Sequence, residues 1–428
     1  MRVAVYDNLG NNAYEQVKAF RRLGVEADVV LDPLDTFVMS DPRWEDLDLE
    51  LPADELDVAA LPAGAHVPAW VRSAPAGRDP RSLPGLAVGA LRVPPEVGRA
   101  LRVAGLRGAQ LAAGRSWVLR TLREYDLVYA RGVGPAWCAL AHVRCIAQTY
   151  GGDITITPFL DRPGFEGAEH TPVQSPSGED RAVARLQRAG LQACERVLLT
   201  DPRFGPFAER LGLSERSEFV PFVLDVEKFS PGEDAALRRE LLGGDGAGVL
   251  VLVPSRQDWR WKGSDRILRG FAAAAGGRPD ARLVCAGWGE DLDRSRALAA
   301  ELGIDERIVL LPNALSKSRL VRHLRAADVV IDQVVLGSYG TSALEAMSCA
   351  RPLVMYIDPA RFEGLFGEPP PVCNAESADD VGRELARLID DAGLRVAAGE
   401  AGRRWVVENH GDGVARRLLE LGGVPVPG

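Results

Sequence analysis

Short apolar runs alternate with longer helical patterns along the whole chain, and this alternation constrains the fold more than any other feature of the sequence. Runs such as VAVY at 3–6 and VLVLV at 249–253 are typical of buried strands, and a stretch with helical spacing follows each of them. Strands and helices that alternate in this way build parallel sheets from βαβ units. The sequence therefore predicts an α/β fold.

Length and the position of two prolines indicate two domains. At roughly 100–200 residues per domain, 428 residues are enough for two. Pro221 and Pro231 bracket a linker, and a second series of strands and helices opens after it. We expect two Rossmann-like domains that face a cleft, over 1–222 and 223–405, and a helix in 406–428 that crosses back to the first domain.

A segment of the first domain does not fit the βαβ pattern. Residues 32–95 are acidic at first and then rich in proline and glycine, and they are too many for a plain connection between two elements. We expect an insertion here, which is either a surface for a partner or an acceptor, or a loosely ordered loop.

Composition excludes several functional classes. Lys and Arg number 51 and Asp and Glu 60, so the net charge of −9 argues against nucleic acid as a partner. Six cysteines without C-x-x-C spacing are typical of reduced packing residues. The N-terminus has no apolar signal region, and no apolar segment reaches the roughly 20 residues of a membrane-spanning helix. We expect a cytoplasmic protein, with peripheral contact at the inner face of a membrane left open.

Motifs for metals and nucleophiles are missing from the sequence. The five histidines are scattered, and no G-x-S-x-G turn occurs. Two D-x-D spacings, at 46–48 and 291–293, lie in an acidic run and in the first turn of a helix, where aspartate is common anyway. Hydrolase and zinc-enzyme interpretations lose their support, and we expect neither a metal nor a cofactor.

The stretch PSRQDWRWKG at 254–263 is the most informative. Arg256 stands at the carboxyl end of an expected strand, and Lys262 opens the next helix. A guanidinium and an ammonium at the mouth of one βα unit suit a diphosphate. A surface arginine and an ordinary helix start would explain the residues too, but a lysine at a helix start opposes the helix dipole. Only four lysines occur in the chain, which adds weight to the anion-binding interpretation.

A second stretch, GSYGTSALEAM at 337–347, complements these cations. Gly340, Thr341 and Ser342 open a helix after a loop, so their backbone N–H groups form a seat for an anion. Glu345 lies one turn further along in an apolar stripe and needs a partner, either ribose hydroxyls or a neighbouring arginine. The sequence leaves these two partners open.

Two weaker signals lie in the first half of the chain. A strand ends in a glycine turn at 150–152, and Asp153 projects at the tip of this turn. Gly10 and Asn11 belong to a first loop that either lets a ligand approach the backbone or is a simple turn. This loop lacks the G-x-G-x-x-G pattern of dinucleotide folds.

Four of these stretches resemble the retaining, metal-independent GT-B glycosyltransferases, a large group with bacterial enzymes of cell-envelope and natural-product pathways. Each of the four has a counterpart in that family. They are the linker VPFVLDVEKFSP at 220–231, Arg256 with Lys262-Gly263, the strand LVCAGWG at 283–289 and the segment GTSALEAM at 340–347. The resemblance covers roughly 196–404 and is looser in the first half, where GNN at 10–12 and YGGDI at 150–154 carry it.

The resemblance implies a role for each candidate residue. Arg256 and Lys262 would bind the leaving diphosphate, and Glu345 would hold the ribose of the donor. The nucleotide base would meet the backbone of Asn313, Ala314 and Leu315, and Gly10 and Asn11 would face the donor. Asp153 would touch the acceptor or the sugar as a catalytic residue, and Arg131 would touch the acceptor. The family usually carries a carboxylate eight residues before Glu345, where this chain has Gly337.

The expected function is transfer of a sugar from a nucleotide-diphosphate sugar to an acceptor hydroxyl, with retention of anomeric configuration. In this interpretation 1–222 is the acceptor domain, 223–405 binds the nucleotide sugar, and the acceptor is a carbohydrate, a lipid-linked molecule or a small molecule. Two alternatives stay open. One is a non-catalytic subunit that binds a nucleotide sugar, and the other is a sugar-nucleotide epimerase with the same architecture.

Overall fold

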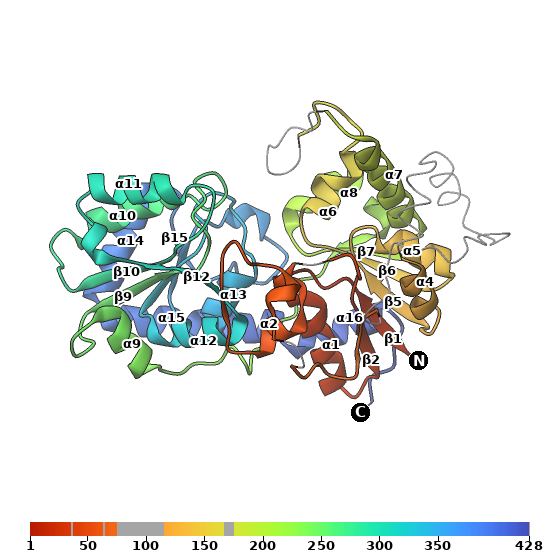
Figure 1. Cartoon of the computed structure of the whole chain (residues 1–428), viewed down its shortest axis with the longest axis horizontal. Coiled ribbons are helices and arrows are strands. Elements are labelled where there is room, and N and C mark those ends of the chain that lie inside the picture. The colour runs from red at the N-terminus through yellow and green to blue at the C-terminus, as the bar shows by residue number, and fades with distance from the viewer. Residues whose placement is uncertain (36, 63–64, 75–114, 167–174, 428) are drawn as a thin grey trace. The chain divides into compact units, whose positions relative to one another are not determined.

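The computed structural model describes residues 1–35, 37–62, 65–74, 115–166 and 175–427. Contacts divide these residues into two units. Unit 1 comprises Met1–Pro42, Ala63–Val223 and Asp412–Gly428, and unit 2 comprises Arg43–Pro62 and Leu224–Gly411. Each unit has its own parallel sheet with helices on both faces (Figure 1). The α/β class predicted from the sequence is therefore confirmed.

The sheet of unit 1 has seven parallel strands. Their order is β4 (Val71–Arg72), β2 (Ala27–Val30), β1 (Val3–Tyr6), β5 (Leu127–Ala130), β6 (Arg144–Thr149), β7 (Arg196–Leu199) and β8 (Ser217–Phe219). Side chains on alternate strand positions enter two separate cores. Ala4 and Tyr6 pack on one face, whereas Val3 and Val5 pack on the other. Strands β1 and β5 are buried along their whole length because both of their faces are covered.

Helices cover the two faces of this sheet. One face packs against α4 (Ser116–Leu122), α5 (Gly134–Ala141) and α7 (Gly178–Ala193), and the other against α1 (Asn12–Arg22) and α16 (Asp412–Leu421). Two short helices, α6 (Gly152–Thr155) and α8 (Gly205–Arg210), also belong to the described part of unit 1. Helix α7 begins with a capping box in which Ser177 and Asp180 bond each other's backbone N–H groups.

The sheet of unit 2 has six parallel strands. Their order is β11 (Ile308–Leu311), β10 (Ala281–Ala286), β9 (Val249–Val253), β13 (Val329–Ile331), β14 (Leu353–Met355) and β15 (Cys373–Asn374). One face packs against α10 (Ser264–Ala275), α11 (Leu292–Glu301) and α14 (Ala378–Asp390). The other helices are α9 (Ala235–Leu242), α12 (Lys317–Ala326), α13 (Thr341–Ser348) and α15 (Ala392–His410) (Figure 1).

Residues 43–62 depart from the predicted domain division. The sequence placed the whole insertion 32–95 in the first domain, but this part of it packs within unit 2. It includes most of α2 (Pro42–Asp46), and its strand β3 (Glu50–Pro52) pairs antiparallel with β12 (Asn313–Leu315). The Ser316 hydroxyl donates to the Leu47 carbonyl over 2.7 Å, and the Leu49 N–H donates to the same hydroxyl over 2.9 Å. The segment thus satisfies polar groups that β12 would otherwise expose at its edge. Residues 75–95 lie outside the described residues.

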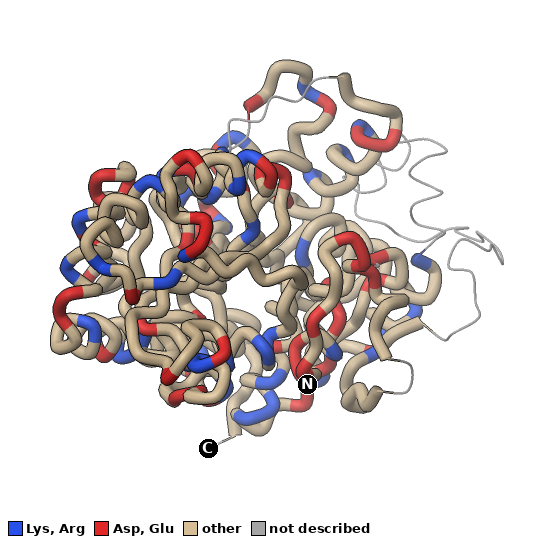
Figure 2. Tube along the Cα trace, turned by 60° about the vertical axis from the view of Figure 1, so that its left-hand side comes forward, with Lys and Arg blue, Asp and Glu red and all other residues tan. Residues whose placement is uncertain are grey.

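The C-terminal helix belongs to unit 1. Helix α16 lies beside α1, and its residues Val414, Ala415, Leu418 and Leu419 enter the core on that face of the sheet. Arg22 of α1 lies 2.7 Å from the Asp412 carboxylate. The return begins later than predicted, because 406–411 still belong to α15 and its end in unit 2. Charges of both signs are interspersed over the described chain (Figure 2).

Candidate functional site

The loop between β9 and α10 is organised by one buried carboxylate. The Arg256 Nη2 atom donates to Asp258 Oδ2 over 2.7 Å, and the Trp261 N–H donates to Asp258 Oδ1 over 2.8 Å. The Lys262 N–H donates to the Asp258 carbonyl over 3.1 Å. Asp258, which lies between the two predicted cations, therefore holds the guanidinium of Arg256 and the backbone of Lys262. Asp258 was not among the residues predicted from the sequence.

The Lys-Gly sequence in this loop has a steric reason. Gly263 is the N-cap of α10 and adopts a left-handed φ of +69°. A Cβ atom there would lie 2.6 Å from Val334 and 3.0 Å from Val335. Both residues belong to the loop that follows β13, so glycine is what allows the two loops to touch.

Lys262 joins these two loops. Its Nζ atom lies 3.3 Å from Asp332 Oδ1, and its carbonyl accepts a hydrogen bond from the Val334 N–H over 3.1 Å. Strands β9 and β13 are neighbours and parallel, so the residues that follow them meet at one edge of the sheet. Asp332 is 1% exposed and was missed by the sequence analysis. An isolated carboxylate directly after the apolar strand VVI was the available signal.

The N-terminus of α13 lies at the end of the same loop. Within the described part of the chain, no side chain caps this helix at Gly340. Gly340 is exposed, and a Cβ on it would have no described atom within 4 Å. Thr341 and Ser342 are partly exposed. The first N–H groups of a helix carry a partial positive charge, so this terminus can receive an anion.

Glu345 is buried in α13 and forms an ion pair with Lys317, the first residue of α12. Burial raises the pKa of Glu345, and the Lys317 ammonium opposes this shift. The Glu345 Oε2 atom is buried and has no hydrogen-bond partner among the described residues. The sequence predicted that this carboxylate needs a partner, and the structure provides a lysine in place of an arginine.

All four lysines of the chain pair with carboxylates that are at least nine-tenths buried. Besides Lys262 and Lys317, Lys228 lies 2.5 Å from Glu45 Oε1 and Lys18 lies 3.3 Å from Glu15 Oε1. Glu45 belongs to the segment 43–62, and its charge also acts on Glu345. Each lysine of this chain therefore forms an ion pair with a buried carboxylate.

Strand β12 contains the backbone predicted to meet a base. Asn313, Ala314 and Leu315 pair with Pro52, Leu51 and Glu50 of β3. Asn313 and Leu315 are partly exposed and Ala314 is buried. The strand leads through Ser316 directly into Lys317, which places this backbone next to the Lys317–Glu345 pair along the chain.

Gly337 has a structural reason for not being a carboxylate. Its φ is +65°, and a Cβ there would lie 3.0 Å from Tyr356, 3.1 Å from Arg361 and 3.2 Å from Asp358. Its carbonyl accepts a hydrogen bond from the Asp358 N–H over 3.1 Å. A larger residue would strain the backbone and crowd this loop.

In unit 1, the first loop is tied down by a buried asparagine. The Asn8 side chain donates to Asn11 Oδ1 over 2.7 Å and accepts from the Tyr14 N–H over 2.9 Å. Gly10 and Asn11 both have left-handed φ values, of 56° and 62°. This loop is therefore a fixed turn at the carboxyl end of β1.

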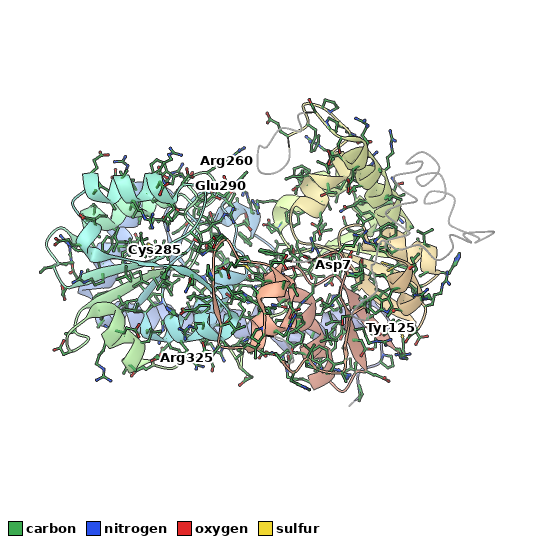
Figure 3. The ribbon with its side chains drawn as sticks, in the orientation of Figure 1. Asp7, Tyr125, Arg260, Cys285, Glu290 and Arg325 are labelled. Atoms are coloured by element: carbon green, nitrogen blue, oxygen red, sulfur yellow. The ribbon has the colours of Figure 1, made fainter. Side chains whose placement is uncertain are left out.

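The other sequence-predicted residues of unit 1 lie at the same sheet edge. Arg131 follows β5 and its Nε lies 3.7 Å from Asp153 Oδ2, while its Nη1 lies 3.2 Å from Asp7 Oδ2. Asp153 Oδ1 accepts the N–H groups of Tyr150 and Gly151, each over 2.9 Å. Asp7, labelled in Figure 3, follows β1 and was missed by the sequence analysis.

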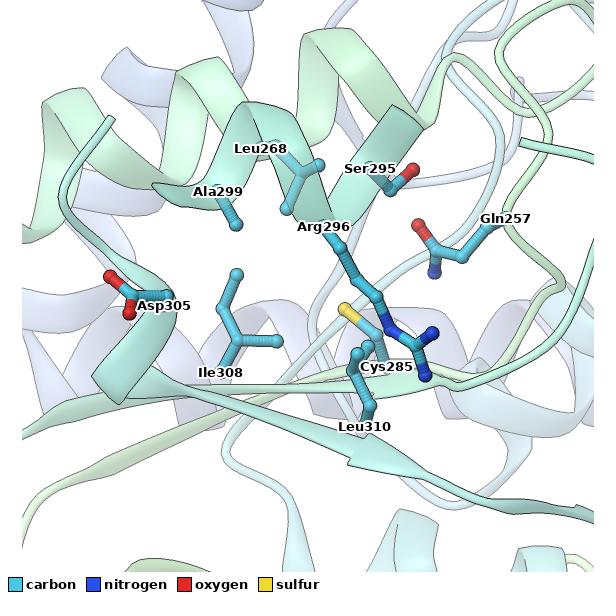
Figure 4. Close-up of a pocket in the computed structure, with 9 residues that line it drawn as sticks. All are labelled: Gln257, Leu268, Cys285, Ser295, Arg296, Ala299, Asp305, Ile308 and Leu310. Atoms are coloured by element: carbon cyan, nitrogen blue, oxygen red, sulfur yellow. The ribbon is translucent and has the colours of Figure 1, made fainter. Parts of the chain in front are cut away.

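A small, mainly apolar pocket lies in unit 2 between α10, α11 and the strands β10 and β11 (Figure 4). It is lined by Gln257, Leu268, Cys285, Ser295, Arg296, Ala299, Asp305, Ile308 and Leu310. Cys285 is buried, which raises its thiol pKa to about 12 and leaves the thiol protonated at neutral pH. The lining includes Gln257, next to Arg256, but neither of the two predicted cations.

The described residues offer neither a cluster of metal ligands nor a membrane-spanning helix. These residues contain no cluster of three or more His, Cys, Asp or Glu side chains arranged to hold a metal ion. They also include no helix that is long and apolar enough to cross a bilayer. All six cysteines, which lie in the described ranges, are free thiols.

Comparison with known proteins defines the class of the fold. The chain aligns over 99% of its length with 99% of HepE from Anabaena, solved in complex with UDP-glucose, with a TM-score of 0.64 and 14% identity. It aligns over 98% of its length with 99% of WaaG, a glycosyltransferase involved in lipopolysaccharide biosynthesis, with a TM-score of 0.58 and 14% identity. The fold is GT-B, with two Rossmann-like domains and a C-terminal helix that returns to the first.

Sequence comparison narrows the class for unit 2. Residues 247–405 match the model of the family glycosyl transferases group 1, which supports a place in that family for the matched part of the chain. The GDP-mannose-dependent alpha-(1-6)-phosphatidylinositol monomannoside mannosyltransferase of Mycolicibacterium smegmatis is 28% identical over 53% of this chain. The D-inositol 3-phosphate glycosyltransferase of Nocardia farcinica is 30% identical over 56% of this chain. The matches span 62% and 54% of these relatives, less than two thirds of either.

Proposed function

We propose that the chain is a glycosyltransferase that moves a sugar from a nucleotide-diphosphate sugar to an acceptor hydroxyl, with retention of anomeric configuration. One observation carries the proposal. Buried carboxylates hold Arg256 and Lys262 in the loop that follows β9. This loop contacts the loop that follows β13, which leads to the N-terminus of α13, where no described side chain caps the helix. The family match and the GT-B fold of the chain agree with it.

The chemistry that these residues support is departure of a nucleoside diphosphate. The bond between the anomeric carbon and the diphosphate oxygen breaks, and the pair of electrons leaves with the diphosphate. Arg256, Lys262 and the N–H groups of Thr341 and Ser342 neutralise the charge that develops there. The acceptor oxygen bonds to the same face of the sugar, and its proton leaves with the diphosphate.

Further contacts fix the two substrates in this proposal. Glu345 binds ribose hydroxyls, and the backbone at 313–315 contacts the base. Gly10 and Asn11 lie at the loop that faces the donor. Asp153 and Arg131 contact the acceptor, which we define only as a carbohydrate, a lipid-linked molecule or a small molecule with a free hydroxyl.

The cations of this site remove the need for a metal at the leaving group. Arg256 and Lys262 together carry the two positive charges that a diphosphate requires. We therefore propose that turnover is insensitive to chelation. A chelator that abolishes turnover, with recovery on addition of a divalent cation, would contradict this part of the proposal.

Release of nucleoside diphosphate tests the proposed activity. Full-length protein is incubated with UDP- and GDP-sugars, with and without acceptors, and the anomeric configuration of any product is read by NMR. We expect slow release with donor alone, faster release with acceptor, and a product with the donor's anomeric configuration. An inverted product would contradict retention, and no release with any donor would contradict transfer.

A non-catalytic nucleotide-sugar-binding subunit is the second candidate. The observation that favours it is Gly337, whose left-handed backbone and crowded Cβ position keep a carboxylate out of this loop. Such a subunit would show a donor-induced rise in melting temperature without any release of nucleoside diphosphate. The two measurements on one preparation separate the candidates.

A further inference from the structure

Three charged side chains meet at one edge of the sheet of unit 1. Asp7, Arg131 and Asp153 follow the strands β1, β5 and β6, which are adjacent and parallel. The Arg131 guanidinium lies 3.2 Å from Asp7 Oδ2 and 3.7 Å from Asp153 Oδ2. In open α/β sheets, ligands bind outside the carboxyl ends of the strands.

Two buried atoms of this cluster have hydrogen-bonding capacity left. Asp153 is 7% exposed, and its Oδ1 atom already accepts two backbone N–H groups. Its Oδ2 atom and the Nε–H of Arg131 have no hydrogen-bond partner among the described residues. Buried polar atoms are rarely left without a partner, so this edge is built to hold a polar ligand in addition to its own ion pairs.

The charge at this edge is unfavourable for an anion. Arg131 already faces two carboxylates, and the next guanidinium along the edge, that of Arg115, lies 2.8 Å from Asp32 after β2. Three carboxylates therefore face two guanidinium groups. A phosphate would compete with Asp7 and Asp153 for Arg131, whereas a hydroxyl can donate to a carboxylate and accept from a guanidinium.

We propose that Asp7, Arg131 and Asp153 bind an uncharged, hydroxyl-rich acceptor and discriminate against its phosphorylated counterpart. This inference rests on the proposed function, because it defines the chemical class of the acceptor in that reaction. Asp7 is responsible for the discrimination against the phosphorylated acceptor, since its carboxylate is the nearer of the two carboxylates that face the Arg131 guanidinium.

The environment of Asp7 fits this role at neutral pH. Burial raises its pKa to about 6, while Arg131 opposes the shift and Asp32, Asp35 and Asp153 add to it. The carboxylate is therefore ionised at pH 7.5, where it neutralises Arg131. Asp7 also has a left-handed φ of 69°, a conformation that aspartate adopts more readily than most residues other than glycine.

Matched acceptors test the inference. Release of nucleoside diphosphate is measured with myo-inositol and inositol monophosphate, and with methyl glucoside and glucose 6-phosphate. We expect the uncharged member of a pair to be used at least about tenfold better. Asp7→Asn, which removes the charge that faces Arg131, should lower turnover with the uncharged member and shift the ratio by about tenfold toward the phosphorylated one.

A control variant separates this effect from a change in net charge. Glu26→Gln removes one negative charge from an exposed residue of unit 1, at the opposite end of β2, and should leave the ratio unchanged. A wild-type preference for the phosphorylated members would overturn the inference, and so would an Asp7→Asn ratio equal to that of the wild type.

Direct binding distinguishes failure of this inference from failure of the proposed function. Calorimetric titration of the same acceptor pairs into the full chain reports the preference of the cluster whether or not any sugar is transferred. Preferential binding of the uncharged members without turnover contradicts the transferase proposal alone. Turnover without discrimination contradicts this inference alone, as does a panel in which no uncharged member binds or is used.

Discussion

The Lys262 ammonium lies 3.3 Å from the Asp332 carboxylate, and this pair connects the loops that follow β9 and β13. Asp332 is almost fully buried. A buried ion pair is weak evidence for stability, because desolvation of both charges offsets much of their attraction. We infer that the pair holds the lysine in position for an anion, because a second cation, Arg256, is held in the same loop by Asp258.

Removal of Lys262 is expected to abolish turnover for a reason that can be separated from stability. Lys262→Ala should lower release of nucleoside diphosphate by about 100-fold or more. It should also lower the free energy of unfolding by about 3 kcal/mol, because Asp332 is left buried without its partner. The double variant Lys262→Ala/Asp332→Asn should regain most of this stability and none of the activity. If the double variant also regained turnover, the lysine would have only a structural role.

Glu345 is expected to make stability depend on pH. Burial raises its pKa above the ordinary value near 4.5, so the folded protein holds this proton more tightly than the unfolded chain does. Its contribution to stability is therefore present below the ordinary value and is lost as the pH rises through the raised pKa. Urea unfolding at a series of pH values measures this effect. As the pH rises, the free energy of unfolding of the wild type should fall relative to that of Glu345→Gln. Parallel profiles would show that the pKa is not raised.

One buried ion pair should contribute to the attachment of the segment 43–62 to the rest of unit 2, beside the pairing of β3 with β12. Glu45 is 1% exposed and lies 2.5 Å from Lys228. Glu45→Gln should lower the free energy of unfolding by about 3 kcal/mol, as loss of one partner of a buried pair does. Asp48→Asn in the same segment is the control, because this exposed carboxylate pairs with the partly exposed residues Arg319 and Arg322. The control should lose at most about 1 kcal/mol in chemical denaturation, and an equal loss in both variants would contradict a special role for Glu45.

The strands were predictable where both faces are covered. Strands β1 and β9 have the bounds that the apolar runs at 3–6 and 249–253 predict, since burial on both faces demands such runs. Pairing of β3 with β12 was not predictable, because no local pattern in Glu50–Pro52 specifies a partner so far along the chain. The residue at which the chain returns to unit 1 was also predicted wrongly, since α15 continues to His410 without a break in its pattern.

The residues of the candidate site were likewise predictable only in part. Arg256 and Lys262 stand out in the sequence because one ends an expected strand and the other opens the next helix. Their partners Asp258 and Asp332 are single carboxylates whose role depends on the tertiary fold. Asp7 is a similar case. Its importance comes from strands β5 and β6, which bring Arg131 and Asp153 beside it.

Gly337 is expected to serve the backbone of its loop, and a matched glycine isolates this effect. Gly337 and Gly303 share a φ of +65°, but a Cβ at Gly303 would have no described atom within 4 Å, whereas one at Gly337 would be crowded by Tyr356 and Asp358. Gly303→Ala should cost about 1 kcal/mol from the left-handed backbone alone. Gly337→Ala should cost at least about 1 kcal/mol more in chemical denaturation, because the neighbours must also move. Gly337→Glu places the missing carboxylate eight residues before Glu345 and should lower both stability and turnover, since the loop that leads to Gly340 would be distorted. A rise in turnover in that variant would show that the loop tolerates a carboxylate and that the chain lacks one for another reason.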